Sequence, residues 1–175
     1  MKGIFAFLVA LAMMLTSCTS WRKDMRLYSN DTEVSDRRMQ EILEALKSED
    51  IGTLKDMFGK GVLDETENFE DSCQTLLSFF QGEVKKWERI RYSSTGHSGK
   101  DGNWYKIYSW YRVETDKEKY LFFMVDYTKN TVEPQFIGLY TLRVIHEEDE
   151  DTQFTYMEDM ELPGICCPGI KNEEI

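Results

Sequence analysis

Three strand-like runs separated by polar turns constrain the fold of this chain more than any other feature. Residues 104–114, 120–127 and 137–146 are rich in Tyr, Trp, Phe, Val and Ile, the residue types that pack well on a pleated, half-buried surface. The connections between them, residues 116–119 and 128–134, are polar and contain turn residues. This pattern predicts an antiparallel meander.

Both faces of the predicted meander are substantially apolar. A sheet with one face in water would alternate more cleanly between apolar and polar residues, so each face needs a cover. We expect helices on one face, and a partner subunit or the chain's own C-terminal segment on the other. A homodimer through the sheet is therefore possible. Four side chains on one face of the first run form the candidate pocket or interface: Trp104, Tyr108, Trp110 and Arg112.

Helical periodicity precedes the meander. Three segments carry apolar side chains at helical spacing: Met39 to Leu46, Ile51 to Phe58 and Phe69 to Phe80. Ser35 or Asp36 can cap the first of these helices. A further strand is predicted from Val84 to Ser94, and residues 93–103 read as a loop rich in Gly, Ser and Asp. The fold class is therefore α+β, with three N-terminal helices packed on an antiparallel sheet.

The N-terminus resembles the signal of a bacterial lipoprotein. The uncharged apolar run from Gly3 to Leu15 is short for a transmembrane helix but long enough for the core of a secretory signal. Leu15-Thr16-Ser17-Cys18 resembles the lipobox at all four positions. The resemblance implies cleavage before Cys18, lipidation of its thiol and anchoring on the extracytoplasmic side of the cell membrane. An ordinary signal peptide, or a buried helix with a chance cysteine, is the alternative.

The predicted organisation has four parts: a signal peptide at residues 1–17, a lipidated cysteine and tether at 18–35, a single α+β domain at 36–165 and a C-terminal tail at 166–175. The formal net charge of −11 disfavours nucleic acid or an anionic membrane surface as a partner. Plain solvation of the surface explains this charge without any cationic ligand.

The cysteines and acidic residues give no metal or cofactor motif. With Cys18 lipidated, Cys73, Cys166 and Cys167 remain, so at least one thiol is unpaired within a monomer. Cys73 could join either of the others if the tail folds back, although its position on a helical stripe favours a buried apolar role. The acidic run at residues 147–151 lacks the turn glycine of a calcium loop and favours a solvated hairpin or tail.

Several short segments resemble the domain-of-unknown-function 5104 family of bacterial lipoproteins. They are Leu46-Lys47-Ser48-Glu49-Asp50 with Leu54 to Phe58, Phe79-Phe80-Gln81-Gly82, Tyr127-Thr128-Lys129-Asn130, Ile137-Gly138-Leu139-Tyr140 and Leu162-Pro163-Gly164-Ile165. The order of helices and strands is similar to the nuclear-transport-factor-2-like, or cystatin-like, fold. That resemblance implies a curved sheet covered by helices on its concave side. The family brings no activity with it.

For function, a small-ligand or partner-binding domain at the membrane is expected, because the sheet is rich in Tyr and Trp. A pocket enzyme using acid/base chemistry is the alternative, with Asp126, Asp56 and His97 as candidates, and a structural envelope protein is a second one. Asp126 also belongs to the candidate pocket because it is surrounded by apolar residues in the sequence. A position at a strand end, bonded to the neighbouring Thr128 turn, is the alternative. A filled interior would favour an interaction module.

Overall fold

The computed structural model describes residues 30–154 and 160–169. The chain divides into two units, residues 1–34 and residues 35–175, and the second contains the whole sheet. The predicted signal peptide and the lipobox Cys18 lie outside the described residues, as does most of the predicted tether.

In the described residues, four helices precede the first strand: α3 (Asp31–Ser48), α4 (Ile51–Asp56), α5 (Lys60–Glu65) and α6 (Phe69–Phe79). The expectation of three helices was wrong because α5 has only two large apolar residues, Val62 and Leu63, and adjacent positions show no helical period. The first helix begins at Asp31 rather than at Ser35. The side chain of Asp50 caps α4 by accepting a 2.9 Å hydrogen bond from the backbone N–H of Thr53.

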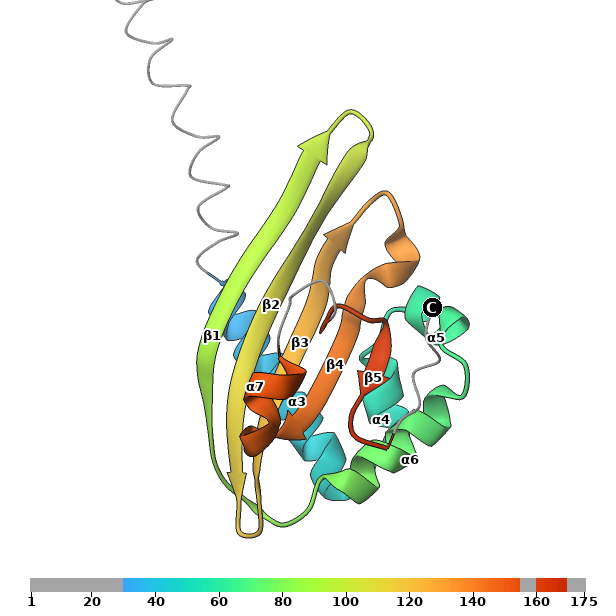
Figure 1. The fold of residues 1–175 in the computed structure, drawn as a ribbon. Helices are drawn as coiled ribbons and strands as arrows, with labels where there is room; N and C mark the ends of the chain where they lie inside the picture. Colours follow the sequence, from blue (N-terminus) through green and yellow to red (C-terminus); the bar gives the residue numbers. More distant parts are fainter. Residues whose placement is uncertain (1–29, 155–159, 170–175) are drawn as a thin grey trace, which may run out of the picture. The chain divides into compact units, whose positions relative to one another are not determined.

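Five strands form one sheet in the order β1-β2-β3-β4-β5 (Figure 1). They are β1 (Val84–Gly99), β2 (Gly102–Thr115), β3 (Lys119–Asn130), β4 (Gly138–His146) and β5 (Gly164–Cys166). The first four strands pair antiparallel in sequence order, and β5 pairs parallel to β4. The α+β class and the antiparallel meander are therefore confirmed. A short 3-10 helix, η1 (Pro134–Phe136), connects β3 to β4.

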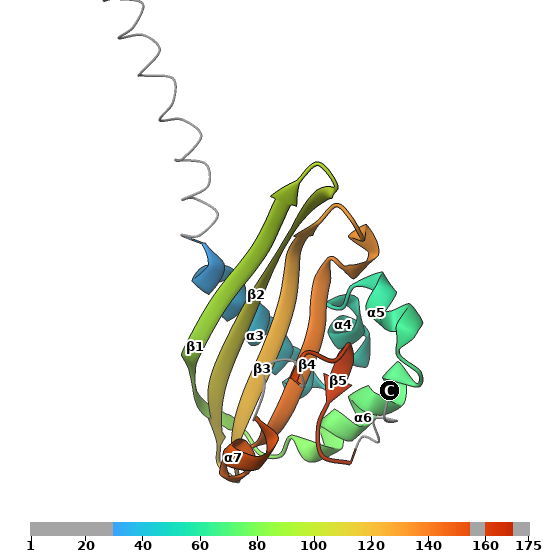
Figure 2. The ribbon, with the colours of Figure 1, turned by 45° about the horizontal axis from the view of Figure 1, so that its top comes forward.

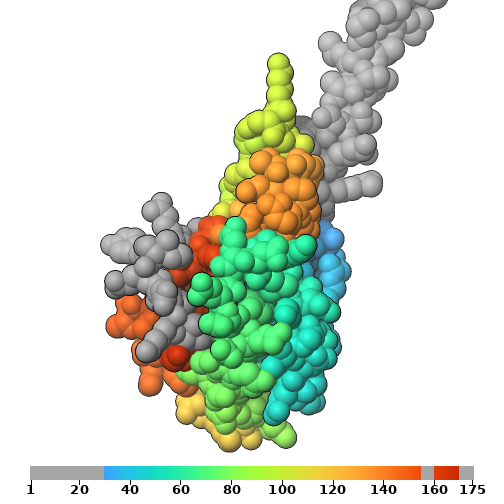
Figure 3. All heavy atoms as spheres, turned by 90° about the vertical axis from the view of Figure 1, so that its right-hand side faces the viewer, coloured from blue at the N-terminus to red at the C-terminus, as the bar shows by residue number. Residues whose placement is uncertain are grey.

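The loop expected at residues 93–103 was wrong, because β1 continues to Gly99 and forms a hairpin with β2. The small polar residues of this segment look like a loop in the sequence, but the backbone pairs with the aromatic strand β2. Gly96 is needed there, since a Cβ at that position would come within 2.7 Å of the Tyr105 ring. The hairpin extends beyond the other strands (Figure 1), and its tip projects from the surface (Figure 3).

The C-terminal part also differs from the expectation. The acidic run at 147–151 is not a hairpin or tail but two short helical turns, η2 (Glu147–Asp149) and α7 (Glu150–Gln153). The turn expected at 161–165 gives way to β5, which the sequence hides because it is only three residues long and follows Pro163. The short strand expected at 154–160 lies mostly outside the described residues.

The main core fills the space between the helices and one face of the sheet, which we call the inner face. Tyr111, Phe122 and Met124 are at most 1% exposed and pack in one cluster with Met39 of α3 and Leu76 of α6. Figures 1 and 2 show α3 behind the sheet and α7 on the opposite side, which we call the outer face. Helices thus cover one face, as expected.

Candidate functional site

The five residues selected from the sequence do not form one site. Trp104, Tyr108, Trp110 and Arg112 alternate along β2 and share the outer face. Asp126 of β3 lies on the inner face, where Arg38 of α3 contacts it. The residues of the predicted pocket or interface therefore lie in two places: four on the aromatic outer face, and Asp126 in an ion pair beneath the helices.

The outer face holds a second apolar cluster. Tyr108 and Trp110 are each only 6% exposed and pack with Phe123 and Val125 of β3. The rings of Trp110 and Phe123 lie 4.9 Å apart between centroids. Met160, from the C-terminal segment, belongs to the same cluster and is 3% exposed. The chain's own C-terminal segment, one of the two covers considered for this face, therefore packs on it.

Lys106 of β2 binds the C-terminal segment to the sheet through an ion pair. Its ammonium binds the Glu161 carboxylate, which also accepts a 2.9 Å hydrogen bond from the Tyr108 hydroxyl. The Nζ of Lys106 lies 5.8 Å, 5.2 Å and 5.5 Å from the ring centroids of Trp104, Tyr108 and Tyr127. Burial favours the neutral amine, but the bonds to Glu161 and Tyr108 outweigh it, so the pKa of Lys106 is raised. Lys106 is therefore a permanent cation in a ring of aromatic side chains.

Trp104 and Arg112, the first and last of the four candidate residues on β2, have different surroundings. Trp104 is half-buried and stacks on His97 across the hairpin, with centroids 6.4 Å apart. Arg112 binds Glu147 of η2 and lies 3.3 Å from the carboxylate of Glu88 on β1. Bonding to Glu147 raises the pKa of Arg112. Both residues are therefore held by contacts with other residues of the same chain.

On the inner face, two ion pairs join α3 to the sheet. Arg38 donates a 2.7 Å hydrogen bond to Asp126, and both side chains are mostly buried. Asp36 accepts hydrogen bonds from Arg89 of β1 and, at 2.9 Å, from the hydroxyl of Tyr111. Burial, and then the bond to Asp36, raises the pKa of Tyr111. The carboxylates at this interface are neutralised by arginines rather than open to a cavity.

The acid/base candidates Asp56, His97 and Asp126 lie on three different elements. Asp56 is exposed at the end of α4, and Asp126 is paired on β3. His97 is exposed on β1 and lies 3.1 Å from the Asp101 carboxylate, whose pKa is lowered by that hydrogen bond. These positions do not bring a base and its orienting partner together in a pocket.

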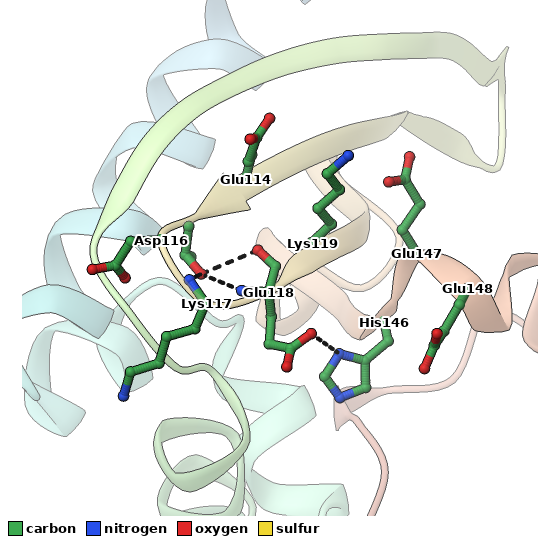
Figure 4. Close-up of a pocket in the computed structure, with 9 residues that line it drawn as sticks. Glu114, Asp116, Lys117, Glu118, Lys119, His146, Glu147 and Glu148 are labelled. Carbon is green, nitrogen blue, oxygen red and sulfur yellow. Dashed lines mark hydrogen bonds and ion pairs between the residues drawn. The ribbon is translucent and has the colours of Figure 1, made fainter.

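A cleft of about 500 Å³ lies elsewhere, at the turn between β2 and β3 (Figure 4). Its lining is mostly charged, with Glu114, Glu118 and Glu147 among the acidic residues. Glu118 points toward His146, and its Oε2 lies 4.0 Å from the Nδ1 of His146. The cleft is open to solvent and most of its lining side chains are charged, so it lacks the character of a small-molecule pocket.

The three cysteines in the described residues are buried, and none of them forms a disulfide. Burial raises the pKa of the Cys73 thiol to about 11 and that of Cys167 to about 12. The tail does fold back, as β5 packs against α6, and Cys73 and Cys167 share the main core. Cys73 therefore has the buried apolar role that its helical stripe indicated.

Sequence reasoning missed the residues that organise both faces. Arg38, Asp36 and Glu161 lie far along the chain from their partners and belong to no motif. For Lys106, a signal did exist, because it alternates with Trp104 and Tyr108 on the same face of β2. A cation between aromatic residues on one face indicates a cation–π arrangement.

Together, the fold and these contacts define an α+β domain with a filled helix–sheet interior and an aromatic outer face. The model of the family described as "Domain of unknown function (DUF5104)" matches residues 41–147. Because the match covers more than half of the chain, the chain belongs to this family, and the family resemblance is confirmed. No curated protein matches the chain at a significant level. Among the described residues, no helix has the length and apolar character needed to cross a membrane.

Proposed function

We propose that this chain is a lipid-anchored recognition domain of the bacterial cell envelope. Cys18 carries the anchor, and the α+β domain binds a small ligand or a partner protein on the extracytoplasmic side. The lipobox-like tetrad Leu15-Thr16-Ser17-Cys18 supports the anchor. Two acyl chains are enough for stable membrane attachment without a membrane-spanning helix.

The observation that carries the recognition role is the filled interior. Tyr111, Phe122 and Met124 fill the space between the sheet and the helices, so their side chains occupy the interior that a substrate pocket there would need. Asp126, the most deeply placed acid/base candidate, is neutralised by Arg38. Recognition at the surface needs neither an open cavity nor a free carboxylate, so it fits this arrangement better than catalysis.

We also propose that the fold is of the nuclear-transport-factor-2-like type. Helices packed against one face of an antiparallel sheet support this assignment. The ion pairs Arg38–Asp126 and Asp36–Arg89 then hold the first long helix against the sheet.

Metabolic labelling tests the anchor. The full chain is expressed in a bacterial host fed with an alkyne-tagged fatty acid, and its membrane fraction is examined for label. We expect the natural chain to be labelled and membrane-bound, and Cys18→Ser to lose both properties. Cys73→Ala is the matched control and should keep the label. Equal labelling of Cys18→Ser would contradict the anchor.

Native mass spectrometry tests recognition. The full chain is released from membranes in a mild detergent, and the folded species is weighed. We expect a reproducible, stoichiometric ligand or partner that is lost when the chain is unfolded. A bare chain in every preparation, together with turnover of a small substrate, would overturn the recognition role in favour of an enzyme.

A further inference from the structure

We propose that the edge of the sheet between Arg91 and Gly99 binds an extended, acidic segment of a partner protein by strand addition. This inference rests on the proposed recognition function and gives it a place and a class of partner. It does not use the cleft at the β2–β3 turn, and from the aromatic outer face it uses only Trp104 and Trp110, whose rings contact β1.

β1 has backbone hydrogen-bonding groups along one edge that are available to an added strand. β1 is the end strand of the sheet and pairs with β2 alone among the strands of the described residues. In an antiparallel edge strand, alternate residues direct their backbone N–H and C=O groups away from the sheet. β1 is 16 residues long, whereas most strands have about five or six, so many such groups are presented. An extended chain can pair with them directly.

Only the first half of β1 has features that disfavour pairing with an added strand. Bulges interrupt the register between Val84 and Lys86 and between Arg89 and Arg91. Lys85 and Lys86 add exposed charges to the same half. From Arg91 to Gly99, nine residues pair with β2 without a shift, and this stretch contains no Pro and no Lys. The second half is therefore a regular, unprotected edge.

The side chains around this stretch favour an added strand with larger side chains. Most residues from Ser93 to Ser98 are small, and they are exposed or half-buried. Aromatic rings from β2 reach over β1 on both faces. The Tyr105 ring covers Gly96, and its hydroxyl donates a 2.8 Å hydrogen bond to Ser94, while Trp104 stacks on His97. Alternate side chains of an added strand would pack against these rings.

Charge selects the partner. From Arg91 to Gly99 the edge carries one basic and no acidic side chain, whereas the whole chain has a formal net charge of −11. In the first half of β1, Lys85 and Lys86 are paired with Glu83 and Glu88. Arg89 is paired with Asp36, but Arg91 is exposed and lies over the Trp110 ring at 4.5 Å, and Lys100 follows in the exposed turn. Asp101 is the nearby acid, and it is held by His97. A second copy of β1 would bring like charges together, so an acidic segment is the better occupant.

Peptide binding to the full chain in detergent micelles tests the site. The probe is a fluorescent nine-residue peptide of alternating Val and Thr with an acidic residue at each end, measured by anisotropy. We expect saturable binding. The same peptide with all of its backbone nitrogens methylated loses about four hydrogen bonds whichever edge it presents. At about 1 kcal/mol for each bond, it should bind roughly a thousandfold more weakly. Equal binding of the two peptides would overturn strand addition.

A matched pair of variants tests the charge. Lys100→Glu lies beside the proposed edge, and Lys117→Glu makes the same charge change at the β2–β3 turn. We expect Lys100→Glu to weaken binding about threefold and Lys117→Glu to leave it unchanged, because exposed charge pairs contribute up to about 1 kcal/mol. Equal weakening by both variants would show attraction to net charge alone. A dimer through β1 that excludes the peptide would show that a second copy is the occupant.

The outcome also separates this inference from the proposed function. If native mass spectrometry finds a bound ligand but that ligand and the acidic peptide bind together without competition, the edge is not its site and only this inference fails. If the released chain is bare and the peptide does not bind, both fail.

Discussion

β3 and β1 belong to the same sheet but have opposite relations to the rest of the chain. From Tyr120 to Asp126, β3 is buried on both faces, whereas no residue of β1 is fully buried. β3 has neighbours on both sides and apolar clusters on both faces, and β1 has one neighbour. The comparison shows that the centre of the sheet stabilises the fold, while the β1 edge is available for contacts with other molecules.

The largest expected effect on stability comes from removing a buried aromatic ring from β3. Phe122 of β3 is fully buried, whereas Tyr92 of β1 is 47% exposed. Phe122→Ala should lower the free energy of unfolding by about 3–5 kcal/mol, because it leaves a cavity in the main core. Tyr92→Ala should lower it by less than about 1 kcal/mol. Urea denaturation measures both values, and comparable losses would remove the distinction between the strands.

The next effect concerns the pairing of α3 with β3. Arg38→Ala leaves the mostly buried carboxylate of Asp126 without its partner. We expect a loss of about 2–3 kcal/mol in the free energy of unfolding, most of which reflects the unpaired charge. Asp126→Asn should cost less, and the double variant should cost less than the sum of the two. Additive losses in this double-mutant cycle would show that the ion pair does not stabilise the fold.

A smaller effect is expected on the outer face, where Glu161 joins Lys106 and Tyr108. Glu161→Gln keeps the shape but removes the charge, and should cost about 1–2 kcal/mol. It should also increase the exposure of Trp110, which red-shifts tryptophan fluorescence. Glu148→Gln, at the rim of the β2–β3 cleft, is the matched control and should change neither quantity. No difference between the variants would contradict the fastening role of Lys106.

The last effect is absent at neutral pH and develops in alkali. Burial raises the pKa of Cys73 from its ordinary value of 9.0 to about 11. The folded state therefore holds this proton more tightly, so its stabilising contribution is complete below pH 9 and is lost as the pH rises to about 11. Cys73→Ala should reduce the slope of stability against pH in that window. The pKa of the buried Tyr111 and Tyr120 is also raised, so part of the slope should remain.

The same contrast explains how much of the structure the sequence predicts. The run from Tyr120 to Val125 is apolar at every position, as expected of a strand buried on both faces, and its location was predicted to within a few residues. The segment from Ser93 to Gly99 has the composition of a loop, and only its pairing with β2 makes it a strand. Helix α5 has only the adjacent large apolar residues Val62 and Leu63, and strand β5 is three residues long, so no period identifies either of them.

The candidate site was less predictable than the fold. Alternation correctly placed Trp104, Tyr108 and Trp110 on one face, because side-chain direction along a strand is a local property. The partners of Asp126 and Lys106 were not predictable, because Arg38 and Glu161 meet them only through the tertiary fold. Arg38 and Asp126 are 88 positions apart in the chain, and Lys106 and Glu161 are 55 positions apart. A single sequence contains no local signal for contacts over such separations.

Native-state hydrogen exchange tests the central contrast most directly. Backbone amides of β3 should exchange only through global unfolding, and amides of Arg91–Gly99 that face away from β2 should exchange much faster. In that result, the centre of the sheet stabilises the fold and the β1 edge is open to a partner. Equal protection of the two segments in the isolated chain would contradict this account, because it would show that the edge is already paired.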